Sequence, residues 1–154
     1  MKIDRRVKES FTVIGKEGST EDGEGFIKRL WDEANARFGE VETLAKRDEE
    51  GGLAGIWGVM SDLSRSFRPW EDNFTKGLYL AGIEAKDEAE APEGWVKWVI
   101  PSYEYLYTEE DGPDTFGRVI SYMEENGISL AGAAFDFNCP QDGKSYLFFP
   151  VRRL

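Results

Sequence analysis

Histidine is absent from the 154-residue chain, and cysteine occurs once, as Cys139. The absence of histidine excludes Ser-His-Asp and Cys-His nucleophile pairs and histidine-ligated metals. A lone cysteine forms no intrachain disulfide and argues against a thiolate zinc site, so Cys139 is interpreted as a structural thiol. We therefore expect no metal and no organic cofactor. Any chemistry should depend on carboxylates, tyrosines, lysines or water.

Basic residues are also scarce, with 19 Lys and Arg against 30 Asp and Glu, a formal net charge of −11. Such a surface repels phosphate backbones, so we expect no direct nucleic-acid partner. No apolar run approaches the ~20 residues that span a membrane, and no apolar signal segment follows Met1. We expect a cytoplasmic protein without a membrane partner. The acidic surface favours solubility and also attracts cationic ligands.

Aromatic residues, by contrast, are abundant: they make up 14% of the chain, with 5 Trp, 6 Tyr and 10 Phe. A small domain has limited room for rings in its core. We therefore expect part of them to line a cavity or an exposed patch.

Two stretches of the chain show the same order of strand, helix, strand and strand. In the first, residues 9–16, 53–61 and 78–85 are strand-like, and an apolar stripe with helical spacing runs from Phe26 to Phe38. In the second, residues 95–107, 130–138 and 145–152 are strand-like and residues 115–126 are helical. The acidic segment 86–94 is typical of a linker between halves.

A repeated tripeptide supports an internal duplication. The sequence Leu-Ala-Gly opens the strand after the helix in both stretches, at 53–55 and at 130–132, an offset of 130 − 53 = 77 residues. The sequence therefore predicts one α+β domain over residues 1–154, a duplicated β-α-β-β fold with pseudo-twofold halves at about 1–86 and 94–154. A ligand cleft is expected at its centre.

The alternation of side chains predicts the two faces of the strand at 130–138. The apolar set should meet the helices, and the set with an acid and an amide should face away from them. The first set comprises Ala131, Ala133, Phe135 and Phe137, and the second Leu130, Gly132, Ala134, Asp136 and Asn138. The offset of 77 then places Trp57 on the helix-free side with Asp136. If both halves curl together, these faces form a concave aromatic site.

Four motifs spread along the whole chain resemble the GyrI-like, or AraC-type effector-binding, domain, a duplicated β-α-β-β fold. They are FTVIG at 11–15, similar to the first strand, and YLAGIE at 79–84, similar to the YxxGxE strand. IPSYEY at 100–105 resembles the opening of the second half, and FPV at 149–151 resembles the closing signature. The order of the four motifs, more than any one of them, carries the resemblance.

The resemblance implies a pocket between the halves for bulky, often cationic or aromatic, compounds. Members joined to a helix-turn-helix module sense drugs for transcription, whereas this chain is expected to be a stand-alone member. Some stand-alone members protect cells from toxins, and some hydrolyse cyclopropane-bearing alkylating compounds with a pocket carboxylate. The family often has a buried Glu in the strand where this chain carries the shorter Asp136.

The candidate catalytic residues are Glu104, between two tyrosines, and Asp136, between two phenylalanines. A carboxylate desolvated by rings can act as a general base, although either acid can equally be solvent-facing. The candidate ligand-binding wall consists of Trp57, Trp98, Tyr103, Tyr105 and Tyr146, each of which can also be core. Trp70 and Phe67 lie in the loop between two strands and are candidates for a lid.

Two functions follow from these features. The first is binding of bulky hydrophobic or cationic drug-like molecules, with or without metal-free hydrolysis of a strained electrophile. The second is a protein-interaction or inhibitor module, gyrase-inhibitor-like, that uses its acidic surface to occupy a basic, DNA-binding surface of a protein partner. Acids gathered in one patch favour the second function, and acids scattered around an aromatic cleft favour the first.

Overall fold

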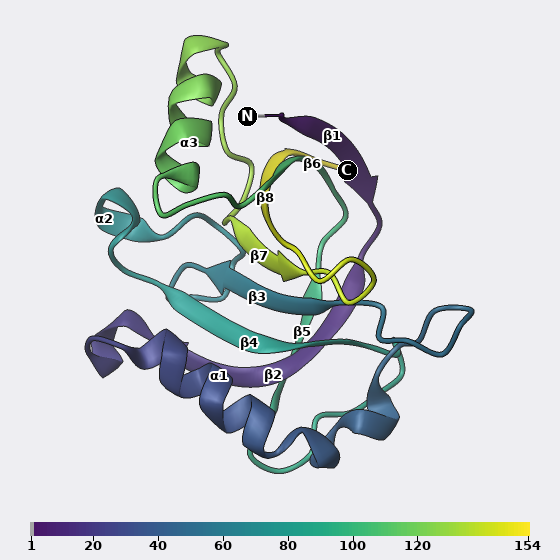
Figure 1. Cartoon of the computed structure of the whole chain (residues 1–154). Helices are drawn as coiled ribbons and strands as arrows, with labels where there is room; N and C mark the ends of the chain where they lie inside the picture. The colour runs from purple at the N-terminus through teal and green to yellow at the C-terminus, as the bar shows by residue number, and fades with distance from the viewer. Residues whose placement is uncertain (1) are drawn as a thin grey trace.

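A computed structural model describes residues 2–154 as a mixed α+β fold built on one curled antiparallel sheet (Figure 1). The sheet has eight strands in the order β1-β6-β8-β7-β3-β4-β2-β5. The strands are β1 (Asp4–Lys8), β2 (Phe11–Ser19), β3 (Ile56–Ser61), β4 (Leu78–Ala85), β5 (Val96–Ile100), β6 (Tyr103–Glu109), β7 (Phe135–Asn138) and β8 (Ser145–Arg153). The helices are α1 (Phe26–Ala36), α2 (Glu71–Phe74) and α3 (Thr115–Glu125), with short 3-10 turns η1 (Thr20–Asp22), η2 (Phe38–Glu40) and η3 (Glu42–Leu44).

The strand order confirms the predicted duplication. Exchanging β1 with β5, β2 with β6, β3 with β7 and β4 with β8 reproduces the same order read from the other end. Each half contains one strand more than the sequence predicts, because β1 and β5 precede the β-α-β-β unit. These two strands are exchanged: β1 pairs with β6 of the other half, and β5 pairs with β2.

The segment expected as one strand over residues 95–107 is divided into β5 and β6. Pro101 and Ser102 separate them. Proline has no N–H to donate to a sheet ladder and is confined to strand ends and edges. The interruption lets the chain pass from one part of the sheet, where β5 pairs with β2, to another, where β6 pairs with β1 and β8.

Both longer helices lie on one side of the sheet, the helix side. An apolar face of α1 packs on β2 and β4, and α3 buries Val119 and Met123 against Leu106, Leu147 and Phe149 of β6 and β8. The middle strands β3 and β7 therefore lie between the two helices, and α2 is placed between them too (Figure 1). We call the region over β3 between α1 and α3 the helix-side cleft; it contains two cavities, one lined by Ile56 and the other by Met60.

The opposite face of the sheet carries the main aromatic core. Strands from both halves contribute to one cluster there, so this face is the inside of the curl. Its buried members are Phe11, Val13, Trp57, Val59, Leu78, Leu80, Trp98, Ile100, Tyr103, Tyr105, Phe135, Phe137 and Phe148.

The predicted side of the sheet agrees with the structure for Trp57 and is reversed for the residues of β7. In the ladder between β3 and β7, Trp57 faces Phe137 and Gly58 faces Asp136, and directly opposed residues share a face. Trp57 and the two phenylalanines thus point into the aromatic core, while Asp136 points to the helix side. The alternation over residues 134–138 is as predicted, but the apolar set was expected to meet the helices, whereas the aromatic core on the opposite face buries Phe135 and Phe137.

Candidate functional site: a buried carboxylate between the helices

Asp136 lies at the centre of the sheet, on the helix side of β7. Its Oδ2 accepts a hydrogen bond of 2.7 Å from the hydroxyl of Tyr79 in β4. That hydroxyl in turn accepts a 3.1 Å hydrogen bond from the indole Nε1 of Trp31 in α1. A polar chain therefore runs from the first helix, across the sheet, to the carboxylate.

The local sequence makes this contact possible because residue 58 is glycine. Gly58 lies in β3, between the strands that carry Tyr79 and Asp136. A Cβ atom placed on Gly58 would come within 1.8 Å of the Tyr79 hydroxyl oxygen and 3.1 Å of the Asp136 Oδ2. The phenol of Tyr79 thus crosses β3 through the space that a side chain would fill.

The surroundings of Asp136 disfavour its charged form. Burial raises the pKa of Asp136 to about 6, although the hydrogen bond from Tyr79 acts in the opposite direction, and the charge of Glu110 raises the pKa further. Burial beside this carboxylate also raises the pKa of Tyr79, so its hydroxyl remains a donor. Asp136 therefore gains or loses its proton near neutral pH, while the Tyr79 hydroxyl keeps its proton and remains a hydrogen-bond donor.

An apolar cavity lies near the carboxylate: Ala134, two residues before Asp136, is part of its lining, and Asp136 itself is not. The volume of the cavity is about 220 Å³. Its floor includes Met60, two residues beyond Gly58 on the same face of β3. We call it cavity 2. Its lining residues are Met60, Pro69, Trp70, Phe74, Phe116, Leu130, Ala133 and Ala134. Aromatic walls next to one acidic group are the usual composition of a ligand pocket.

Residues 69–74 form the outer wall of this cavity, and we call them the lid segment. The indole of Trp70 donates to the carbonyl oxygen of Leu78 at 2.9 Å, and the ring of Phe74 packs edge-on against Phe116 with centroids 5.4 Å apart. Asp72, Asn73 and Phe74 all have positive φ, of 50°, 56° and 64°. This conformation is uncommon for any residue other than glycine and costs free energy for a bulky one. A change of backbone conformation in the lid segment would release this strain.

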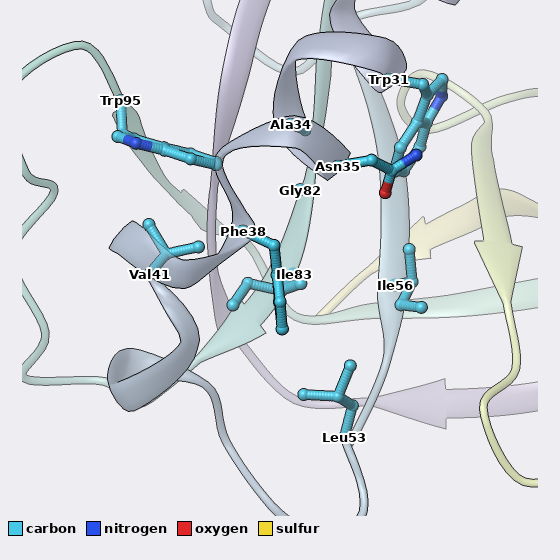
Figure 2. A pocket seen from close by; sticks show the side chains of 10 residues that line it. All are labelled: Trp31, Ala34, Asn35, Phe38, Val41, Leu53, Ile56, Gly82, Ile83 and Trp95. Carbon is cyan, nitrogen blue, oxygen red and sulfur yellow. The ribbon is translucent and has the colours of Figure 1, made fainter.

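A second cavity, cavity 1, lies at the other end of the cleft, between α1 and the sheet, with a volume of about 230 Å³. Figure 2 shows Trp95 and Trp31 on opposite walls, with Phe38 and Ile83 between them. The complete lining is Trp31, Ala34, Asn35, Phe38, Val41, Leu53, Ile56, Gly82, Ile83 and Trp95.

No protein-family model and no curated protein sequence matches the chain. Solved structures do. The chain is similar to SAV2435 bound to tetraphenylphosphonium, with a TM-score of 0.67 and 16% identity over 99% of this chain and 94% of that one. It is also similar to the C-terminal domain of EcmrR, with a TM-score of 0.66 and 14% identity over 99% and 98%. The chain has the GyrI-like fold.

A third structure with this fold is a hydrolase from Listeria innocua, with a TM-score of 0.50 and 14% identity over 97% of this chain and 91% of that one. At these identities the similarity establishes the fold. The roles of individual residues have to come from this chain's own geometry.

Within the GyrI-like fold, the five predicted wall residues come together in the aromatic core, on the face opposite Asp136. Trp57, Trp98, Tyr103 and Tyr105 are at most 4% exposed, and Tyr146 is half-buried at the edge of the cluster. Hydrogen bonding of Tyr146 to Asp142 raises its pKa to about 12. The structure thus brings these five residues to each other and not to Asp136.

Two buried carboxylates within this core escaped the sequence analysis. The indole of Trp57 donates to Glu84 at 3.1 Å, and the indole of Trp98 donates to Glu17 at 2.8 Å. Lys8 pairs with Glu84 at 3.3 Å and Arg65 pairs with Glu17. Glu84 closes the motif at 79–84, but its facing depends on strand register, which the motif does not reveal.

The two candidate catalytic acids are far apart. Glu104 pairs with Arg5 at 3.7 Å and with Arg152 at 3.3 Å. In the sheet, Glu104 faces Arg152 and Asp136 faces Leu147, so the two acids are five residues apart along β8, roughly 16 Å. They form no carboxylate pair.

The candidate lid residues also lie on different faces. Phe67 packs on Trp98 in the aromatic core with centroids 6.0 Å apart, whereas Trp70 lines cavity 2. Over residues 2–154, no group of three or more acids or cysteines is arranged to hold a metal ion. No helix in this part of the chain is long and apolar enough to cross a membrane.

Proposed function

We propose that this protein binds bulky apolar cations in the helix-side cleft, with Asp136 as the counter-charge. The observation that supports this most strongly is the pairing of its buried acids. Glu84, Glu17 and Glu104 each have a lysine or arginine partner, and the buried Asp62 accepts hydrogen bonds from two serine hydroxyls and two backbone N–H groups. Among the described residues, Asp136 has only the neutral hydroxyl of Tyr79. A buried carboxylate needs a compensating charge, and an apolar cation in cavity 2 supplies it.

Binding requires the lid segment to move. Pockets for drug-sized ligands have volumes of roughly 300–1,000 Å³, and cavity 2 has about 220 Å³. Displacing residues 69–74 enlarges the cavity and exposes Trp70 and Phe74 to the ligand, whose rings then pack on aromatic walls. The complex of SAV2435 with tetraphenylphosphonium supports this class of ligand for the fold.

The test is a calorimetric titration with tetraphenylphosphonium and with triphenylphosphine oxide, a neutral aryl compound of similar build. Loss of a charged partner costs ~1.5–3 kcal/mol, so Asp136→Asn should weaken binding of the cation roughly ten- to hundredfold. Asp87→Asn makes the same charge change at an exposed position and should have no effect. The neutral compound should bind both variants alike. Equal binding of the cation to Asp136→Asn and Asp87→Asn would refute the proposal.

Hydrolysis is a second candidate, favoured by the titration of Asp136 near neutrality. A carboxyl group with a pKa of about 6 can exchange protons at the pH of a cell. In this candidate, Asp136 accepts a proton from a water whose oxygen bonds to a cyclopropane carbon. The ring C–C bond at that carbon breaks, its electron pair passes to the electron-accepting group of the compound, and that group takes up a proton from solvent. The distant Glu104 takes no part. Turnover of a cyclopropane-bearing alkylating compound, followed by chromatography, separates the two functions. Turnover lost in Asp136→Asn and retained in Glu104→Gln would favour the enzyme.

The inhibitor hypothesis remains a prediction from the net charge of −11. It concerns the outer surface and a protein partner, so it does not depend on Asp136. Cytoplasmic location is likewise inferred from the sequence.

A further inference from the structure

Three residues on the helix side of β3 connect the two cavities. Ile56 lines cavity 1, Gly58 faces Asp136, and Met60 lines cavity 2. Alternate residues of a strand share a face, and four residue steps cover ~13 Å. The carboxylate therefore lies midway between two apolar cavities, each of which is smaller than the roughly 300–1,000 Å³ of a pocket for a drug-sized ligand.

Two side chains, Trp31 and Tyr79, lie between the cavities. Trp31 lines cavity 1, and its indole N–H donates to Tyr79, the partner of Asp136. It also packs in the same apolar cluster as Met60 and Trp70, which line cavity 2. Trp31 is partly exposed and makes a single side-chain hydrogen bond among the described residues. A change of the Trp31 rotamer, together with a shift of the Tyr79 phenol that lies over Gly58, would join the two cavities past the carboxylate.

We propose that cavity 1 is a second compartment of the Asp136 site, and that the site selects elongated cations with the charge near the middle and an aryl group at each end. This inference rests on the proposed function and specifies its ligand. Both ends of the cleft have mainly apolar linings, including Phe38 and Ile83 in cavity 1 and Phe116 and Leu130 in cavity 2.

The position of the carboxylate in the cleft determines which part of the ligand should carry the positive charge. A charged group placed in an apolar compartment loses hydration without compensation. The carboxylate at the middle compensates a central charge and is ~7 Å, two strand residues, from either compartment. Ligands with terminal charges should therefore bind more weakly than ligands of equal length with a central charge.

The probes are quaternary dimethylammonium ions with either one or two ω-phenylalkyl arms, in a series of arm lengths. The ratio of the two dissociation constants at each arm length measures the contribution of the second compartment. We expect the two-armed ion to bind at least ten times more tightly than the one-armed ion, because a second aromatic ring is buried. The ratio should be largest when the arms place the rings ~13 Å apart.

Filling cavity 1 should remove the tighter binding of the two-armed ion. Ile56→Trp fills it from the sheet, and Ala34→Met fills it from α1, where Met is a good helix former. Either variant should bring the ratio close to one. Val99→Trp is the matched control, because Val99 is 54% exposed on the edge strand β5, and it should keep the wild-type ratio. Two filling variants are used because one of them can fail to fold.

The outcomes separate this inference from the function on which it rests. A ratio near one in the wild-type protein, or a ratio that both filling variants leave unchanged, overturns the two-compartment site while cation binding stands. Failure of every cation to bind overturns both. A terminal dication that binds more tightly than the central cation of equal length overturns the assignment of the charge.

Discussion

Gly58 and Asp136 face each other across the ladder between β3 and β7, on the side of the sheet that carries the helices. The missing side chain at Gly58 lets Tyr79 reach the carboxylate from the next strand but one. A carboxylate is thereby held at the floor of the cleft by a neutral donor. This relationship leads to the first prediction.

Gly58→Ala should destabilise the protein, because its Cβ and the Tyr79 hydroxyl cannot occupy the same space. Overpacking of this kind costs ~1–3 kcal/mol in the free energy of unfolding. Gly117→Ala is the control: it lies within α3 with open space around its Cβ, so it should stabilise by ~0.5–1 kcal/mol. Urea denaturation measures both. Equal stabilities of Gly58→Ala and the wild type would contradict the packing described for Tyr79.

The stability of the protein should depend on pH through Asp136. The pKa of this group is raised in the folded state, so its favourable contribution is complete below pH ~4, the unfolded value, and is lost as the pH rises through about 6. From 3.8 to about 6, the loss amounts to at most ~3 kcal/mol. Asp136→Asn does not titrate and should be more stable than the wild type at pH 7.5. Its advantage should disappear at pH 4, and an advantage that does not change with pH would contradict the raised pKa.

The lid segment should control the rate at which cations enter. Phe74→Ala removes the edge contact with Phe116 and should raise the association rate of tetraphenylphosphonium several-fold in stopped-flow tryptophan fluorescence. Tyr122→Ala removes an aromatic ring on α3 that is 38% exposed and away from the lid segment, so it is the control. The same association rate in both variants would show that residues 69–74 do not limit entry.

Trp57 lies within the aromatic core, on the face of the sheet opposite the cleft. Trp57→Ala should destabilise the fold by ~3–5 kcal/mol, because it removes a ring that is 2% exposed and contacts Phe11, Phe137 and Phe148. The milder Trp57→Phe should keep the fold and bind cations as the wild type does. A weaker affinity in Trp57→Phe, measured by calorimetry, would instead support the sequence-based prediction that Trp57 contacts the ligand.

The sequence predicted the duplicated order of elements because each β-α-β-β unit has its own periodicity and turn residues. It missed β1, whose residues Asp4–Lys8 include four charged side chains and show no apolar alternation. Residues Asp4–Lys8 form a strand because they pair with β6. Long-range pairing of this kind leaves no local pattern in the sequence.

The site was predicted only in part for a similar reason. Asp136 was identified from its phenylalanine neighbours, but its side of the sheet was reversed, because the sequence does not show that the largest apolar core lies on the face without helices. Gly58 and Tyr79 were not identified as partners of Asp136, because the three residues lie on three neighbouring strands that are far apart in the sequence. The left-handed turn of the lid segment has no glycine to signal it.

The most direct test of the account is a carbon-13 NMR titration of the Asp136 side-chain carboxyl, with and without saturating tetraphenylphosphonium. In the free protein the midpoint should lie at a pKa of about 6. A bound cation stabilises the carboxylate, so the midpoint in the complex should fall by one unit or more, the scale of ~1.4 kcal/mol or more of interaction. The same midpoint in the free and the saturated protein would contradict the claim that Asp136 is the counter-charge of the ligand.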